Sequence, residues 1–214
     1  MIAVTIGIGD GWKQAATRAA ARVQEMTELA VHIIDRNDFG AAHPAWLKLK
    51  IPEMFPAHDE FFYFDSDILM LRHWLAREMF EAMGRPFMAV PDVNSLPVLR
   101  ECQAFQLPFP DWYVNSGLFV FGREHRPVLD AAWARHPSYG TWLEQTALNR
   151  ALIDTRTEVC RLPRTFNTLL WPGVDNYSPE ALRARPEIIL HAASLGGNAD
   201  LLRAVQRAAF DSTS

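Results

Sequence analysis

Short apolar runs alternate with longer amphipathic stretches along the whole chain. Runs rich in valine, isoleucine and phenylalanine predict strands at Ile2–Ile8, Leu29–Ile34, Phe61–Phe64, Pro86–Val90, Trp112–Phe121 and Ile188–Leu190. Helical patterns cover Lys13–Thr27, Ala45–Phe55, Pro127–His136, Trp142–Ile153 and Leu201–Phe210, whereas Val93–Pro110 is predicted to be irregular. We expect Pro52 to bend or end the second of these helices. Strands that alternate with helices predict an α/β fold, in which residues 1–214 form a single domain with a doubly wound, mostly parallel sheet and helices on both faces.

Composition and charge narrow the class of protein. The 214 residues are 49% hydrophobic and 21% charged, which is typical of a folded domain. A net charge of −4 without a block of Lys or Arg argues against nucleic-acid binding. No apolar run is long enough to predict a membrane span, and the first residues resemble a strand rather than a secretion signal. Cys102 and Cys160 fit no metal or redox spacing, so we expect two buried free thiols and a cytoplasmic protein.

Two aspartates follow the most apolar strand. Phe61–Phe64 consists of four aromatic residues, as in a central strand covered on both faces, and Asp65 and Asp67 come next. Residues two apart in extended backbone project to the same side, and such carboxylates repel each other unless a cation or a shared proton offsets the charge. Carboxylate oxygens suit Mg²⁺ or Mn²⁺, with substrate phosphates completing the coordination. Because ligands bind beyond the carboxyl ends of parallel strands, the pair predicts a metal–phosphate site rather than a solvated acidic turn.

Two classes of protein place Asp-x-Asp after an apolar strand. Glycosyltransferases hold manganese and the diphosphate of the donor with it, whereas haloacid-dehalogenase-type phosphohydrolases use the two residues as nucleophile and acid/base. The phosphohydrolases usually have small residues directly after the pair and a second acidic pair later. Here Ile68 and Leu69 follow, and the late aspartates Asp175, Asp200 and Asp211 are isolated. The pattern favours glycosyl transfer and leaves the phosphohydrolase as the weaker alternative.

Several segments, spread from about Ala3 to Gly197, resemble motifs of glycosyltransferase family 8, the group that contains glycogenin and bacterial lipooligosaccharide galactosyltransferases. The segments are Lys48–Ile51, Phe62–Leu69, Tyr113–Gly117, Glu144–Asn149, Leu162-Pro163 with Phe166-Asn167, and His191. The resemblance implies a GT-A type, Rossmann-like fold. It also implies a retaining, metal-dependent enzyme that transfers a hexose from a UDP-sugar to a saccharide or another hydroxyl acceptor.

The resemblance assigns roles to individual residues. The metal, Mn²⁺ or Mg²⁺, would be bound by Asp65, Asp67 and His191. The donor would be contacted by Ile8, Gly9, Asp10, Lys48, Asp65, Ser66, Asp92, Asn115 and Ser116, with Asp10 near the uridine and Asp92 near the sugar. Gln145 would lie beneath the anomeric carbon, where an amide oxygen stabilises an oxocarbenium-like centre but cannot act as a base. Retention would then rely on same-face attack assisted by the leaving phosphate.

Some of these residues also have ordinary structural explanations. Lys48 fits a solvated lysine on a helix, and Asp10 and Asp92 each fit a turn at the end of a strand. Thr141-x-x-Glu144 before an apolar helix fits a capping box, in which Glu144 would cap the helix.

The sequence departs from the family pattern at two places. Thr146 stands where the family has a third acidic residue, which removes one carboxylate from the sugar pocket. Ser194 and Gly197 replace the glycine and the lysine of the family's His-x-x-Gly-x-x-Lys motif, and that lysine grips the diphosphate. These departures motivate a second hypothesis, a nucleotide-sugar-binding protein that has lost transfer activity.

Overall fold

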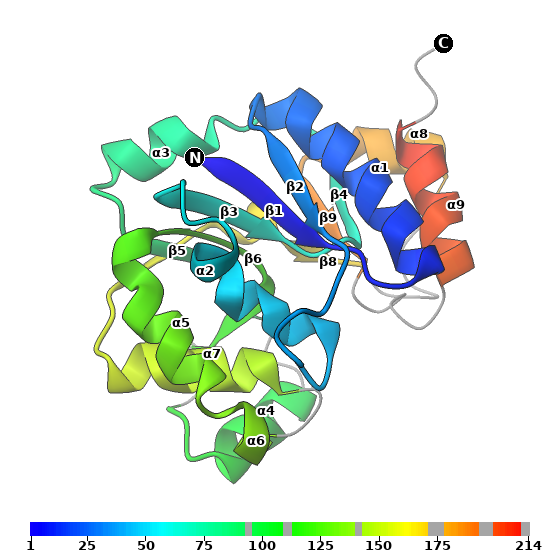
Figure 1. The fold of residues 1–214 in the computed structure, drawn as a ribbon. Coiled ribbons are helices and arrows are strands. Elements are labelled where there is room, and N and C mark those ends of the chain that lie inside the picture. Colours follow the sequence, from blue (N-terminus) through cyan, green and yellow to red (C-terminus); the bar gives the residue numbers. More distant parts are fainter. Residues whose placement is uncertain (93–95, 109–112, 140–142, 171–177, 193–198, 211–214) are drawn as a thin grey trace.

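The computed structural model describes residues 1–92, 96–108, 113–139, 143–170, 178–192 and 199–210. Its centre is a six-stranded sheet in the order β2-β1-β3-β6-β5-β7 (Figure 1). These strands are β1 (Ile2–Ile6), β2 (Val31–Ile34), β3 (Glu60–Phe64), β5 (Phe87–Pro91), β6 (Val114–Gly122) and β7 (Val159–Arg161). Of the six strands, β6 alone runs antiparallel to its neighbours. The predicted α/β fold with a mostly parallel sheet is therefore confirmed.

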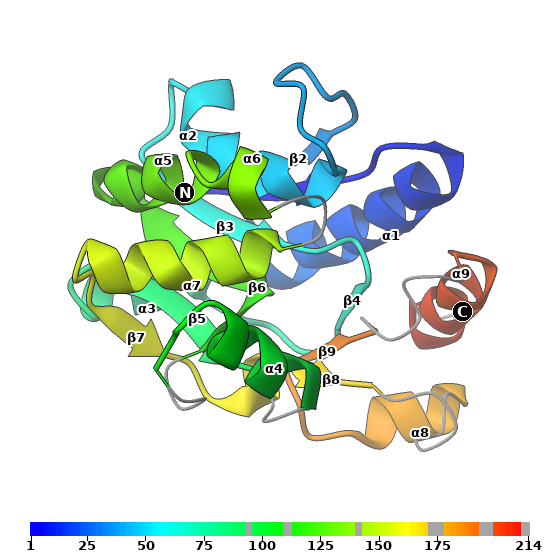
Figure 2. The same ribbon diagram turned by 90° about the horizontal axis from the view of Figure 1, so that it is seen from below.

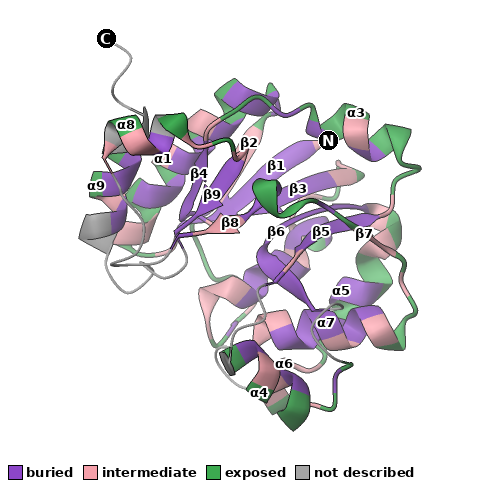
Figure 3. Cartoon of the chain, turned by 180° about the vertical axis from the view of Figure 1, so that it is seen from behind, coloured by how far each residue is buried: buried purple, intermediate pink, exposed green. Residues whose placement is uncertain are grey.

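Side chains of alternate residues in the sheet build two hydrophobic cores. Phe61 and Tyr63 face a layer made by the 3₁₀ helix η1 (Pro44–Lys50) and by α2 (Ile51–Met54), α5 (Arg126–Trp133) and α7 (Glu144–Asp154). Phe62 and Phe64 face α1 (Asp10–Thr27) and α3 (Ala76–Ala82) on the other side. Figure 2 shows α5 and α7 side by side, and Figure 3 shows the buried central strands. Helices thus cover both faces of the sheet, as predicted.

A second, three-stranded sheet carries the last part of the chain. It consists of β4 (Ile68–Met70), β9 (Ile189–His191) and β8 (Thr168–Leu169), in that order. β9 lies antiparallel to β4, so that Ile68 pairs with His191. α8 (Pro179–Ala184) and α9 (Ala199–Phe210) pack on this sheet through Leu182, Leu202 and Val205. The sequence patterns did not predict this sheet, although they did predict β9 and α9 as elements.

Several local predictions need correction. The stretch expected to be irregular contains the helix α4 (Leu96–Ala104). Pro97 does not prevent this helix, because it falls in the first turn, where proline is tolerated. Val98 and Cys102, one turn apart, stabilise it by packing against Tyr113. The helix expected over Ala45–Phe55 is a 3₁₀ helix up to Lys50 and an α-helix only from Ile51 to Met54. The short α6 (His136–Tyr139) and the strands β7 and β8 were not predicted.

The two cysteines differ in burial. Cys102 is buried and Cys160 is only half-buried, so the expectation of two buried thiols is wrong for Cys160, although both thiols are free.

Among the described residues, no helix is both long enough and apolar enough to cross a membrane.

Candidate functional site

The topology of the main sheet gathers the predicted site residues at one edge. β1, β3 and β5 are parallel and end there, and the antiparallel β6 begins there. Asp65 follows β3, Asp92 follows β5, and Asn115 and Ser116 lie at the start of β6. The register places Phe64 opposite Leu118 and Pro91 opposite Val114, so these polar residues sit on adjacent strand ends.

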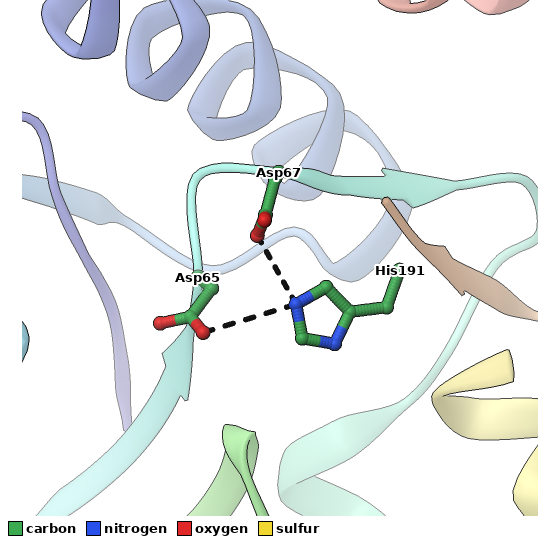
Figure 4. Close-up of side chains that lie close together, drawn as sticks. All are labelled: Asp65, Asp67 and His191. Atoms are coloured by element: carbon green, nitrogen blue, oxygen red, sulfur yellow. Dashed lines mark ion pairs between the residues drawn. The ribbon is translucent and has the colours of Figure 1, made fainter. Parts of the chain in front are cut away.

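Asp65, Asp67 and His191 form a compact cluster at this edge (Figure 4). The His191 Nε2 atom lies 3.1 Å from Asp67 Oδ1 and 3.8 Å from Asp65 Oδ2. One ligand atom of each residue lies within 4.8 Å of the others. Asp67 and His191 are buried, whereas Asp65 is partly exposed. The structure therefore brings together the three residues predicted to bind a metal, two of them from the turn between β3 and β4 and one from β9.

The electrostatics of the cluster suit a cation. Burial would raise the pKa of Asp67, but the imidazole of His191 and the ammonium of Lys48 hold it below its usual value. Burial would lower the pKa of His191, but Asp67 and Asp65 raise it. Asp67 Oδ1 is buried and makes no hydrogen bond within the described residues, although His191 Nε2 is close. A buried carboxylate oxygen without a hydrogen bond is costly, and a divalent cation would satisfy it.

Asp65 is held on one side and open on the other. The Tyr63 hydroxyl and the Lys48 ammonium both donate to its Oδ1 atom, the latter over 3.3 Å. Burial and the neighbouring Asp65 carboxylate raise the pKa of Tyr63 well above its usual value, so the hydroxyl keeps its proton and remains a donor. Oδ2 is the oxygen that faces His191. The carboxylate is thus oriented before any ligand arrives.

Lys48 is a buried cation at the centre of a polar network. Its Nζ donates to the Ser116 carbonyl over 3.1 Å and to Glu144 Oε1 over 3.4 Å, in addition to Asp65. Burial would lower the pKa of Lys48, but the Asp65 and Glu144 carboxylates keep it above the usual value. The alternative of a solvated lysine is therefore wrong, because only 1% of the side chain is exposed.

Glu144 is not the partner in a capping box. It is the first residue of α7, whose N-cap is Leu143, so it lies too early in the helix for that motif. Its carboxylate instead contacts Lys48 and accepts from the Ser116 hydroxyl over 3.3 Å. Thr141, the other half of the expected box, lies outside the described residues.

Gln145 joins the start of β6 to Asp92. Its Oε1 accepts from the Ser116 backbone N–H over 2.8 Å, and its Nε2 donates to Asp92 Oδ2 over 2.7 Å. The N–H donor on one side and the carboxylate on the other fix the orientation of the amide. The carbonyl oxygen keeps one lone pair, so its predicted role toward an anomeric carbon remains a prediction.

Two asparagines extend this network to a small pocket. Asn115 donates to Asp92 Oδ2 over 3.3 Å and accepts from the Gly117 N–H and from Asn167 Nδ2 over 2.8 and 2.9 Å. Beside them lies a cavity of about 220 Å³, lined by Pro91, Asp92, Asn115, Arg164, Asn167, Thr168 and Leu169. Buried carboxylate and amide groups next to apolar walls are a suitable lining for a sugar.

The turn that carries Asp65 and Asp67 is anchored by α9. Ser66 is buried, and its carbonyl accepts from the Gln206 Nε2 atom over 3.0 Å. Gln206 is fully buried and also donates to the Ala15 carbonyl over 3.3 Å. The sequence patterns identified α9 only as a packing helix, and nothing in them pointed to Gln206.

The predicted nucleotide-binding segment lies at the same edge but is not joined to the cluster. Ile8 and Gly9 follow β1, Gly9 adopts a φ of 89°, and Asp10 is the exposed first residue of α1. Among the described residues, no hydrogen bond or ion pair links the Asp10 side chain to the metal cluster. Ser194 and Gly197, where the family lysine is missing, lie outside the described residues.

A carboxylate from another helix lies beside Thr146. The Thr146 hydroxyl donates to Glu101 Oε2 over 2.6 Å, and the Tyr113 hydroxyl donates to the same oxygen over 2.9 Å. Glu101 belongs to α4, which was predicted to be irregular, so no sequence pattern placed it near α7. Whether the sugar pocket lacks a carboxylate at position 146 stays a prediction, because Glu101 does not line the pocket.

The comparisons with known proteins bear on the fold. No family model matches the sequence, and no curated protein matches it. Among solved structures, the galactosyltransferase LgtC in complex with donor and acceptor sugar analogs aligns with a TM-score of 0.62 and 16% identity, over 96% of this chain and 95% of that one. A glycosyltransferase involved in glycosylation of the major capsid of PBCV-1 aligns with a TM-score of 0.59 and 11% identity, over 95% and 100%.

A third structure, mouse xyloside xylosyltransferase 1, aligns with a TM-score of 0.53 and 13% identity, over 90% of this chain and 97% of that one. At these identities the likeness concerns the fold. The chain has the GT-A fold of glycosyltransferases.

Proposed function

We propose that this chain is a retaining, metal-dependent glycosyltransferase that transfers a hexose from a UDP-sugar to a hydroxyl group of a saccharide or another acceptor. The observation that carries the proposal is the Asp65, Asp67 and His191 cluster at the strand ends of a GT-A fold. The family 8 resemblance of the sequence and the glycosyltransferase structures that share the fold support the same reaction class.

The cluster fits a divalent cation. Two carboxylates and an imidazole form a donor set suited to Mn²⁺ and acceptable to Mg²⁺, and Asp67 Oδ1 is buried beside His191 Nε2, 3.1 Å away. Asp65 would use Oδ2, because Tyr63 and Lys48 occupy Oδ1. When bound, the ion would offset the negative charge that develops on the departing nucleotide diphosphate.

The remaining network would bind and orient the donor. Lys48 holds Asp65 in place and adds positive charge beside the predicted diphosphate position. Asp92 and Asn115 would accept from and donate to sugar hydroxyls in the pocket that they line. Gln145, fixed between Ser116 and Asp92, would present the free lone pair of its amide oxygen to the anomeric carbon. Ile8, Gly9, Asp10 and Ser66 are proposed to contact the nucleotide.

UDP release from UDP-glucose and UDP-galactose in the presence of Mn²⁺ tests this proposal without knowledge of the acceptor. We expect slow release that stops when a chelator is added. A generic phosphomonoester with Mg²⁺ serves as the second arm, because its turnover would support the phosphohydrolase instead. The absence of both UDP release and UDP binding would contradict the proposal.

A nucleotide-sugar-binding protein without transfer activity is the second candidate. The observation that favours it is the glycine at position 197, where the family motif has the lysine that grips the diphosphate. This candidate predicts Mn²⁺-dependent UDP binding together with no release of UDP from any UDP-sugar, with or without added saccharides. A panel of UDP-sugars, measured for both binding and turnover, separates the two candidates.

A further inference from the structure

Glu101 reaches the candidate site from α4, a helix that no sequence pattern predicted. We infer that Glu101 is a positioning residue for the proposed sugar pocket. Its carboxylate holds α4 against α7 and β6 and thereby fixes the Gln145–Asp92 pair. The inferred role rests on the proposed function, because only that function makes the pocket a sugar site. The contact that Glu101 makes can be tested without it.

The contact is a triangle of two hydroxyl groups and one carboxylate. Thr146 Oγ1 and the Tyr113 hydroxyl lie 2.6 and 2.9 Å from Glu101 Oε2, and 2.9 Å from each other. Thr146 belongs to the first turn of α7, and Tyr113 directly precedes β6. One carboxylate oxygen therefore ties three separate segments together. Hydrogen bonds to a charged acceptor are shorter and stronger than those between neutral groups.

The two hydroxyl groups depend on this acceptor because they are buried. Thr146 has no exposed surface and Tyr113 is 2% exposed, whereas Glu101 is half-buried at the rim of the contact. Burial raises the pKa of Tyr113, so its hydroxyl stays protonated and able to donate. Val98, Cys102 and Leu107 pack against Tyr113 from the same side, which adds an apolar contact to the polar one. Without Glu101, the two hydroxyl groups lose the charged acceptor that they share.

Both partners of Glu101 are next to the Gln145–Asp92 pair, of which Asp92 lines the proposed sugar pocket. Thr146 follows Gln145 in the chain, and the Tyr113 carbonyl accepts from the Asp92 N–H over 2.9 Å. Gln145 and Asp92 are in turn joined by the 2.7 Å bond between Nε2 and Oδ2. Gln145 is on α7, whereas Asp92 precedes α4. A shift of α4 relative to α7 would therefore change the distance between the two residues. Glu101 thus acts on the pocket through Gln145 and Asp92, and it lies outside the metal cluster.

Three variants of α4 test the inference. Glu101→Leu removes the acceptor at similar volume, Glu101→Gln retains it, and Gln103→Leu is a matched control at an exposed position of the same helix. We expect Glu101→Leu to lower kcat for UDP release about tenfold, because it removes charge-assisted hydrogen bonds that orient Gln145. The Kd values for UDP and Mn²⁺ should not change. Glu101→Gln, whose amide oxygen still accepts but carries no charge, should lose less than Glu101→Leu, and Gln103→Leu should retain nearly full kcat. Wild-type kcat in Glu101→Leu, or an equal loss in Glu101→Gln, would overturn the inference.

Thr146→Val, which removes one donor without a change of shape, gives an independent measure if Glu101→Leu does not fold. It should lower kcat by less than Glu101→Leu does, because Tyr113 still donates to Glu101 Oε2. Where Glu101→Leu folds, the double variant should lose no more than Glu101→Leu alone, because coupled residues are not additive. Additive losses would overturn the inference.

Hydrogen exchange separates this inference from the proposed function. Even in a protein that turns over no UDP-sugar, Glu101→Leu should speed exchange at 97–104 and 144–149 relative to Gln103→Leu, and unchanged exchange would contradict the inferred contact. An inactive wild-type protein with this exchange pattern would refute the proposed reaction and leave the contact intact.

Discussion

At Gly117, the backbone of β6 passes directly beneath His191. A Cβ atom built there would lie 2.3 Å from His191 Cε1 and 2.9 Å from both Asn115 Oδ1 and Asp65 Oδ2. Contacts of this length are forbidden, so any side chain would push the imidazole or the carboxylate away. The Asn-Ser-Gly segment resembles a family motif, and the close approach of His191 and Asp65 gives the physical reason for its glycine.

Gly117→Ala should therefore weaken metal binding while the protein stays folded. We expect the affinity for Mn²⁺ to fall at least about tenfold, because His191 and Asp65 can no longer both reach one ion. Calorimetric titration of the apo protein measures this directly. Gly40→Ala is the control: Gly40 has a φ of 66° and no atom within 4 Å of its Cβ position, so it introduces backbone strain without touching the site. Equal metal affinity in Gly117→Ala and the wild type would contradict the assignment of His191 as a ligand.

The aspartates themselves give a second prediction at this scale. Asp65→Asn and Asp67→Asn should each lower the rate of UDP release by about 100-fold or more, because removal of one preorganised electrostatic contact to a developing charge has effects of this order. Circular dichroism and the melting temperature should show that both variants remain folded. A folded variant with normal turnover would remove these carboxylates from the proposed mechanism.

At the scale of elements, α7 is held on the sheet by Asn149. Its Oδ1 accepts from the Val114 N–H over 2.7 Å, and its Nδ2 donates to the Val114 and Gln145 carbonyls, each over 2.9 Å. The side chain thus pairs with the start of β6 much as a neighbouring strand would. Because Gln145 is one turn earlier on the same helix, this anchor also sets how far Gln145 reaches toward Asp92.

Asn149→Leu should destabilise the fold by about 3 kcal/mol, because it leaves the buried N–H and C=O groups of Val114 without partners. Urea denaturation measures the change in the free energy of unfolding. Arg150→Ala is the matched control on the next residue, where the loss of a surface ion pair with Asp154 should cost less than about 1 kcal/mol. Similar stabilities for Asn149→Leu and Arg150→Ala would show that the anchor contributes little.

The same scale shows which elements can be predicted from a single sequence. β3 was predictable because four consecutive aromatic residues are buried on both faces, and α1 because its small apolar residues recur at helical spacing. α4 was not, because the prolines of the stretch 93–110 suggested a loop, and because Thr146, which Glu101 of α4 contacts, is distant in the chain. β7 and β8 are three and two residues long, too short for a period to emerge. Their existence depends on the neighbouring strands rather than on their own sequence.

At the scale of the whole molecule, the cluster of Asp65, Asp67 and His191 is assembled from both sheets. The main sheet brings Asp65 to the edge, and β4 leads from Asp67 into the small sheet, where β9 carries His191. The aspartates were predictable from their spacing after β3. The position of His191 was predictable only through the family resemblance. The residues around it give no sign that β9 pairs with β4 and places His191 opposite Ile68. The contribution of α9 through Gln206 required the complete fold.

This architecture predicts that nucleotide and metal bind together. UDP alone would bring its negative charge against Asp65 and Asp67, and Gly197 supplies no positive charge at the position of the family lysine. A cation would offset both sets of charges, so each ligand should favour the binding of the other. The single ammonium of Lys48 cannot replace the metal, because the Asp65 and Glu144 carboxylates already accept from it.

Thermal denaturation with UDP, Mn²⁺, both ligands, or UDP with a chelator measures this coupling. A ligand present at 100 times its Kd stabilises the native state by about 2.7 kcal/mol, and each kcal/mol raises Tm by roughly 2–4 °C for a domain of this size. We therefore expect the pair to raise Tm by roughly 5–11 °C and each ligand alone to have a clearly smaller effect. His191→Ala should reduce the joint shift without abolishing it, since two of the three protein ligands remain. A full shift from UDP in the presence of the chelator would contradict the metal bridge, and no shift with any nucleotide would contradict the proposed transferase.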